Sequence, residues 1–482
     1  MNNNITNKTS KGTVWSMLER FSSIGIQLIC TLIIARFVSP DQFGLISMLS
    51  IFIALSQVIV DSGFSQALIR DQEATQVDYS SVFFFNILIG ITIYIVSFYS
   101  APLISEFYNE PELTRLVRVS FLSLISMSFS VVQQAILLKE FNFSKISKIS
   151  ISSALISGFL GIVTAYYMKN AWALVIQSLS FSVLRTILFW NLSTWKPIII
   201  FEWKSIKKYF LFSINLLGSN LISSITDNLP NLLIGKFQSA NNLAYYSIPE
   251  KIQRSISGTI SFSIHRVSYS AMSQFQQNKE HLLSYSQKVV GIAFFIISPI
   301  MLYIGQYSRE LILLFLSSDW ITSAYYLKYL VIVGMLFCFS DINMDILIIR
   351  GKTKLVFLIE VIRKIIFITF LFIGVLNSMK LLLILLIIYQ LFNAIFVSSL
   401  ALRELSANIL YTIKAIIPTL YCLLSSFIIN LILINLHLTI ITSIILGFFV
   451  TFIFYIGTAY IINNYYLKFI QLEFKLMVRS RK

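Results

Sequence analysis

Two carboxylates within one apolar stretch are the residues of this sequence best placed for chemistry. Asp341 and Asp345 stand four positions apart, so in a helix they share one face. Like charges on one face repel unless one carboxylate takes up a proton or a cation lies between them. The pair is a candidate proton or sodium site. The alternative is a hydrated helix end.

A third carboxylate, Asp227, lies in another apolar stretch, with Asn228 beside it and Pro230 three positions on. Proline removes a backbone hydrogen bond and can bend a helix. We therefore expect a hinge or a polar site wall. An ionisable group inside a membrane needs a charged or polar partner, or contact with water. We therefore interpret the following acids as candidates for ion coupling or cavity lining: Glu19, Asp61, Asp227, Asp341 and Asp345.

Basic residues also interrupt the apolar stretches, and some have an acid at helical spacing. Glu250 with Arg254 and Glu360 with Lys364 are four apart, so each pair could neutralise itself along one helix. The three histidines, His265, His281 and His437, are scattered and predict no ligand set. The cysteines are also far apart and predict buried thiols, so we expect neither a metal site nor a cofactor.

The composition predicts an integral membrane protein with no catalytic domain outside the membrane. The chain is 57% hydrophobic and 12% charged, with a mean hydropathy of +0.80, whereas soluble proteins carry about 25% charged residues. The net charge of +16 is interpreted as basic cytoplasmic loops, not as a nucleic-acid-binding surface. RGKTK at 350–354 lacks the upstream glycine of a P-loop, so an ATP-driven pump is not favoured.

A spanning helix needs about 20 mostly apolar residues, and on this basis we predict an all-α fold of about fourteen transmembrane helices. The predicted spans are 14–37, 44–68, 80–101, 114–138, 147–168, 171–191, 209–236, 243–267, 285–306, 324–349, 355–376, 380–401, 412–434 and 439–461. Lys and Arg are concentrated in alternate connections, which predicts that both termini are cytoplasmic.

An internal repeat organises these spans. LIIARFVSPDQFGLIS at 32–47 aligns without a gap with LLIGKFQSANNLAYYS at 232–247, although abundant Leu, Ile and Phe offer a chance explanation. The offset predicts two parallel six-helix lobes related by a pseudo-two-fold axis along the membrane normal. The predicted parts are an N-terminal lobe at 1–191, an amphipathic cytoplasmic linker at 192–208, a second lobe at 209–402, a terminal helix pair at 403–461 and a basic cytoplasmic tail at 462–482.

Several segments carry a family resemblance that extends from Met1 to about Lys279. They include GTVWSMLERFSSIGIQLICTLIIARFVSPDQFGLISM, DSGFSQALIRDQEAT, APLISEFYNEPELTRLVRVSFLSLI, LLKEFNFSKIS and, later, IGKFQSANNLAYYSIPEKI and RGKTKLVFLIEVIRK. In these segments the chain resembles the Wzx-type polysaccharide exporters, in particular the colanic-acid-exporter branch, of the multidrug/oligosaccharidyl-lipid/polysaccharide flippase superfamily.

The resemblance implies alternating access around a cavity between two lobes. It implies a polyprenyl-diphosphate-linked oligosaccharide as substrate, moved to the outer leaflet of the bacterial inner membrane, with membrane lipids, a polysaccharide polymerase and chain-length machinery as partners. A diphosphate needs a cationic cavity, and Arg20, Lys251 and Arg254 fall on spans that line the cavity in this family. The motifs leave two alternatives open: a cation-coupled drug or metabolite antiporter of the same superfamily, and a polysaccharide polymerase or ligase.

Overall fold

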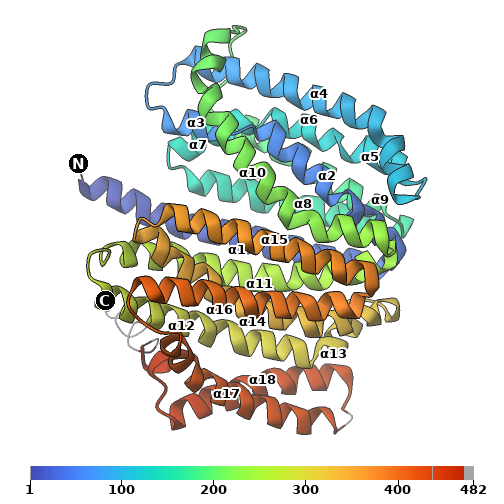
Figure 1. Ribbon diagram of the computed structural model, residues 1–482. Coiled ribbons are helices and arrows are strands. Elements are labelled where there is room, and N and C mark those ends of the chain that lie inside the picture. Colours follow the sequence, from blue (N-terminus) through green and yellow to red (C-terminus); the bar gives the residue numbers. More distant parts are fainter. Residues whose placement is uncertain (1, 437, 470, 472–482) are drawn as a thin grey trace. The chain divides into compact units, whose positions relative to one another are not determined.

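The computed structural model describes residues 2–436, 438–469 and 471. Every regular element in these residues is a helix, and no strand occurs among them. The chain divides into two compact units, residues 1–247 and 248–482, whose helices are labelled in Figure 1.

The first unit holds ten helices and the first turns of an eleventh. They are α1 (Asn2–Phe37), α2 (Pro40–Asp61), α3 (Phe64–Arg70), α4 (Gln76–Tyr108), α5 (Leu113–Ser120), α6 (Leu122–Ser128), α7 (Val131–Lys139), α8 (Phe143–Met168), α9 (Trp172–Leu192), α10 (Trp203–Phe237) and the start of α11 (Ala240–Ser273).

The second unit holds the rest of α11 and seven further α-helices. They are α12 (Lys279–Gln306), α13 (Ser308–Phe315), α14 (Ile321–Ile349), α15 (Thr353–Asn377), α16 (Met379–Glu404), α17 (Leu410–Ile434) and α18 (Ile440–Ile461), with a short 3-10 turn at Ser318–Trp320.

Most of these helices suit a membrane. In the described residues eleven are long and apolar enough to span one, or twelve if the bent pair made of 113–128 and 131–139 forms one span. Each of the fourteen predicted spans falls on a helix or on a run of short helices. Two of the helices that carry predicted spans, α11 and α15, are not among the eleven. They are long enough, at 34 and 25 residues, but they carry more charged or polar residues.

Helix ends follow from local sequence. Proline at the first helical position, as at Pro40 of α2, loses no hydrogen bond there. Ser62 and Gly63 adopt positive φ values of 48° and 72°, which ends α2 and turns the chain into α3. Thr75 and Asp78 form a capping box that begins α4.

Small residues allow the helices of the first unit to approach closely. A Cβ atom on Gly158 of α8 would lie 2.3 Å from the Cys30 sulfur of α1, and one on Gly161 would lie 2.8 Å from Ile34. Membrane helices associate through such close packing, since lipid supplies no hydrophobic drive between them.

The prediction that Cys30, Cys338 and Cys422 are buried thiols is confirmed.

The second unit attaches its last two helices through buried polar contacts. The Tyr307 hydroxyl, at the end of α12, donates to Asn430 Oδ1 of α17 over 2.7 Å, and Asn430 Nδ2 donates to Thr451 Oγ1 of α18 over 2.9 Å. Away from water such hydrogen bonds hold membrane helices together. This chain of contacts fixes α17 and α18 to α12.

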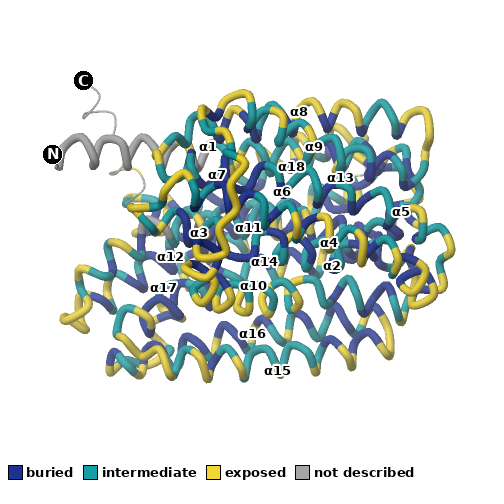
Figure 2. Tube along the Cα trace, turned by 90° about the horizontal axis from the view of Figure 1, so that it is seen from above, coloured by how far each residue is buried: buried dark blue, intermediate teal, exposed yellow. Residues whose placement is uncertain are grey.

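The outer surface of α15 is apolar although the helix carries charge. Phe357 and Leu376 are 72% and 60% exposed, and Figure 2 shows exposed and intermediate residues along most of this helix. The Arg363 side chain, by contrast, is only 15% exposed. An apolar outside and a charged inside are the arrangement expected of a helix surrounded by lipid.

Candidate functional site

An acid–base cluster lies inside the second unit, where α11, α14 and α15 meet. His265 of α11 lies 2.9 Å from Asp345 of α14, measured from Nε2 to Oδ1. Asp345 is 2% exposed, and its other oxygen, Oδ2, has no hydrogen-bond partner among the described residues. A buried carboxylate with one open oxygen can take up a proton or help to hold a cation.

Asp341 lies one turn before Asp345 on α14 and faces the same group. His265, Arg363 and Glu360 all act on it electrostatically, and Arg363 forms an ion pair of 2.6 Å with Glu360. The predicted pairing of Glu360 with Lys364 is therefore wrong, because Arg363, three positions on, turns inward and reaches the carboxylate first. Two acids, one histidine and the Arg363–Glu360 ion pair thus form one cluster.

The role of His265 was missed from the sequence. Its partner is eighty residues away, so only the packing of α11 on α14 reveals the contact. A signal exists within α11, where polar residues recur at helical spacing on one face: Glu250, Arg254, Ser257, Ser261 and His265.

The predicted cations of the second unit lie on the same helix. Arg254 forms an ion pair of 3.1 Å with Glu250, at the predicted spacing of four, and Glu250 is only 9% exposed. Both Lys251 and Arg254 have exposed side chains. This part of α11 therefore carries two cations with exposed side chains, one of them ion-paired with a buried acid.

The candidate residues of the first unit are spread over three helices. On α1, Glu19 is half-buried and Arg20 is exposed; Asp61 ends α2; and Asp227 is exposed on α10. The helix α10 continues through the buried Pro230, and Asn231 ties it to α2 by donating to Ser50 Oγ over 3.2 Å. Glu19 acts electrostatically on Arg185 of α9, and Arg185 Nη2 in turn donates to Gln134 of α7 over 3.0 Å.

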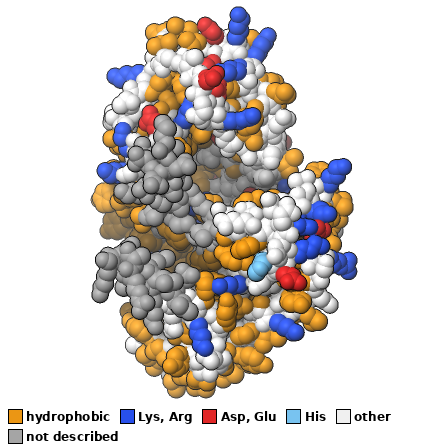
Figure 3. Space-filling view, turned by 90° about the vertical axis from the view of Figure 1, so that its left-hand side faces the viewer, with side chains coloured by type: hydrophobic (Ala, Val, Ile, Leu, Met, Phe, Trp, Pro, Cys, Tyr) orange, Lys and Arg blue, Asp and Glu red, His pale blue; other side chains and the backbone are white. Residues whose placement is uncertain are grey.

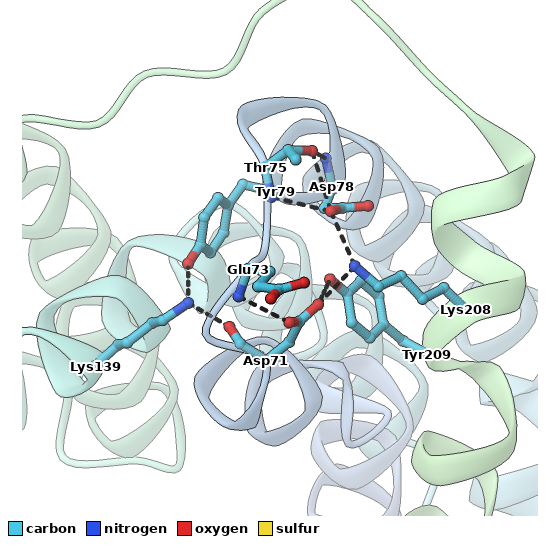
Figure 4. A network of polar contacts seen from close by, with 8 residues as sticks. All are labelled: Asp71, Glu73, Thr75, Asp78, Tyr79, Lys139, Lys208 and Tyr209. Carbon is cyan, nitrogen blue, oxygen red and sulfur yellow. Dashed lines mark hydrogen bonds and ion pairs between the residues drawn. The ribbon is translucent and has the colours of Figure 1, made fainter.

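A second polar network joins the α3–α4 connection to α7 and α10 (Figure 4). Lys208 of α10 lies 2.6 Å from Asp71 and 3.4 Å from Asp78, and the Tyr209 hydroxyl donates to Asp71 over 2.7 Å. The hydrogen bonds from Lys208 and Tyr209 hold the pKa of the Asp71 carboxyl well below its usual value. Lys139 of α7 contacts Tyr79 and the Asp71 carbonyl.

The connection between α9 and α10 lies over this network. Residues 193–202 form no helix or strand, and the amphipathic cytoplasmic linker expected at 192–208 stays a prediction. Ile198 N and Glu202 N donate to the hydroxyls of Ser80 and Ser81 on α4, over 3.0 and 2.9 Å. The backbone of the connection is thus held by α4. In the upper part of Figure 3, Lys and Arg side chains gather at this end of the first unit.

Among the described residues no group of three or more His, Cys, Asp and Glu side chains is arranged to hold a metal ion. Of the predicted acids, the structure brings together Asp341 and Asp345, within the second unit. The others lie on separate helices of the first unit.

Long apolar helices with ionisable groups buried among them are the architecture of a polytopic membrane protein. The family described as "Polysaccharide biosynthesis protein" matches residues 33–325, and the chain belongs to that family. The match confirms the resemblance to Wzx-type polysaccharide exporters.

Relatives support this assignment along most of the chain. The teichuronic acid biosynthesis protein TuaB of Bacillus subtilis is 25% identical over 73% of this chain and 74% of its own length. The lipopolysaccharide biosynthesis protein WzxC of Escherichia coli is 24% identical over 76% of this chain and 75% of its own length. Together with the apolar helices, these relatives identify a multi-pass bacterial membrane protein.

Solved structures share the fold. The lipid II flippase MurJ, in an inward closed conformation, superposes with a TM-score of 0.71 over 94% of this chain and 98% of its own, at 13% identity. A multidrug resistance MATE family transporter of the MOP superfamily, in an inward-facing conformation, gives 0.63 over 81% of this chain and 98% of its own, at 14% identity.

Proposed function

We propose that this protein is a flippase that moves polyprenyl-diphosphate-linked oligosaccharide repeat units from the cytoplasmic to the outer leaflet of the bacterial inner membrane. The observation that carries the proposal is the family match over residues 33–325. The relatives act in the synthesis of teichuronic acid and lipopolysaccharide, as their names state. A polysaccharide polymerase and chain-length machinery are the partners expected to use the delivered unit.

The transport architecture has fourteen spans in this proposal. The eleven apolar helices and the bent pair account for twelve, and α11 and α15 complete the set as polar spans that face protein or water on one side. Two six-helix lobes, 1–191 and 209–402, are joined by the cytoplasmic linker 192–208 and followed by the terminal pair 403–461. Both termini, including the basic tail 462–482, are cytoplasmic. The connections on the opposite side of the membrane carry fewer Lys and Arg than those on the side of the termini.

Substrate recognition is assigned to Arg20, Lys251 and Arg254. A diphosphate carries concentrated negative charge, and guanidinium and ammonium groups bind it through charge-assisted hydrogen bonds. Arg20 on α1 and Lys251 and Arg254 on α11 have exposed side chains. The polyprenyl tail stays in the bilayer while the sugar head group crosses.

Ion coupling is assigned to the cluster of Asp341 and Asp345. Asp345 Oδ2, which has no hydrogen-bond partner in the described part of the chain, and the adjacent His265 provide a place where a proton or a sodium ion changes the local charge. Glu19, Asp61 and Asp227 contribute the polar lining of the transport path. A drug or metabolite antiporter is the second candidate, favoured by the shared fold with the multidrug transporter.

Deletion of the gene in its host, followed by lipid extraction and mass spectrometry, tests the proposal. A flippase predicts accumulation of the polyprenyl-diphosphate oligosaccharide and loss of surface glycan, both reversed by the intact gene. Unchanged lipid-linked intermediates with altered sensitivity to cationic compounds would replace the proposal with the antiporter. Units delivered outside but left unjoined would indicate a polymerase.

A further inference from the structure

An apolar groove with a charged mouth lies in the second unit, over the last turns of α12 and between α14 and α17. Its volume is about 490 Å³. Eight apolar side chains line it, among them Ile332 of α14 and Leu431 of α17. Both of these are more than 40% exposed, so the groove opens toward the surroundings of the helices.

Polar groups gather at one end of the groove. Arg309 and Glu310 at the start of α13, Lys328 near the start of α14 and Gln306 at the end of α12 all line it. Two cations against one acid leave one net positive charge. That charge complements a monoanionic head group, and both Arg309 and Lys328 are exposed.

The wall of the groove is fixed by hydrogen bonds. Gln306 Nε2 donates to the Phe427 carbonyl over 3.1 Å, which joins α12 to α17, and the contact of Tyr307 with Asn430 lies beside it. Gln306 Oε1 is buried and has no hydrogen-bond partner among the described residues. A buried amide oxygen needs a donor, and a hydroxyl-bearing head group would supply one.

We propose that this groove binds a resident anionic glycerophospholipid with a hydroxylated head group, of the phosphatidylglycerol type. Its phosphodiester lies between Arg309 and Lys328, a head-group hydroxyl donates to Gln306, and an acyl chain follows the apolar wall. Acyl chains are equally well solvated elsewhere in the bilayer, so the head group gives the selectivity. On the orientation proposed above, the lipid belongs to the outer leaflet. This inference is independent of which substrate the protein exports.

Native mass spectrometry of the purified full-length protein tests the site, with phosphatidylglycerol and phosphatidylcholine of identical acyl chains as probes. We expect one phosphatidylglycerol to bind in preference to phosphatidylcholine. Arg309→Ala and Lys328→Ala should each weaken its binding roughly fivefold, the effect of one basic residue near a membrane surface. Ile332→Trp should also weaken it by filling the groove, while Glu310→Gln should strengthen it by removing a like charge.

Lys380→Ala is the matched control, because Lys380 is an exposed cation at the start of α16 and does not line the groove. It should leave binding unchanged. Equal binding of the two lipids, or a preference that survives the Arg309→Ala/Lys328→Ala double variant, would overturn the proposal. So would unaltered binding to a folded Ile332→Trp protein, with folding verified by thermal unfolding.

Discussion

Ser47 of α2 and Ser247 of α11 lie with their side-chain oxygens 3.1 Å apart, and they are counterparts in the internal repeat. A residue that contacts its own counterpart is what a two-fold axis between two copies produces. Nearby, a Cβ atom on Gly44 would lie 2.0 Å from the Ala240 carbonyl oxygen, so the two copies approach to backbone contact. Both residues lie within the first unit, and the pseudo-two-fold arrangement of two lobes stays a prediction.

A cysteine pair at these positions should report on alternating access. Ser47→Cys/Ser247→Cys should form a cross-link under oxidation and block export, with export restored by reduction, because the helix ends must separate during transport. Cross-linking is read by mass spectrometry of peptides and export by surface glycan. The single variants are controls. Full export by a completely cross-linked protein would show that these ends stay together throughout the cycle.

Loss of a cavity cation should reduce export while the protein remains in the membrane. We expect Arg20→Ala, Lys251→Ala and Arg254→Ala each to lower the export rate roughly 10- to 100-fold, since a hydrogen bond to a charged group contributes about 1.5–3 kcal/mol. Lys380→Ala is the matched control. Because Arg254→Ala also removes the ion pair with Glu250, Glu250→Gln/Arg254→Ala separates the two effects. Normal export by all three single variants would refute the cationic cavity.

Neutralising Asp341 and Asp345 should change the coupling of export to protons or sodium ions. Asp341→Asn/Asp345→Asn should remove the response of export to pH or to sodium, because no titratable carboxylate then remains on that face of α14. His265→Gln should shift the same response, through its contact with Asp345. Asp319→Asn, at the exposed turn before α14, is the control. An unaltered response in the double variant would leave these acids with a structural role only.

The Asp71 network should add stability that is insensitive to pH over the physiological range. The folded-state pKa of Asp71 is depressed, so its stabilisation is present above the unfolded value of about 3.9 and is lost as pH falls toward the folded value. Asp71→Asn should lower the thermal unfolding temperature by a similar amount from pH 5 to 8. The difference should shrink below pH 4.

Glu73→Gln serves as the control for that measurement, since the Glu73 contact to Asp71 is made by its backbone N–H. A difference between wild type and Asp71→Asn that grows as the pH falls would contradict the assigned direction of the shift.

The sequence predicted helix positions well, because a membrane span can be recognised in a sequence as a long apolar run between polar connections. It also predicted the Glu250–Arg254 pair, which depends on spacing within one helix. It did not predict the contact of His265 with Asp345 or the groove near Arg309 and Lys328, since both depend on how separate helices pack. For Glu360, the spacing of four predicted Lys364 as the partner, whereas the ion pair forms with Arg363, because the direction of each side chain decides which cation reaches the carboxylate.

Flipping in reconstituted vesicles tests the central claim most directly. Lipid-linked oligosaccharide from the deletion strain is incorporated into vesicles with the purified protein, and its sugar is oxidised by external, membrane-impermeant periodate. The account predicts that the protein exposes the inner-leaflet lipid to oxidation, and that Lys251→Ala does so far more slowly. Inner-leaflet lipid that stays protected with the folded protein present, with and without a pH or sodium gradient, would contradict it.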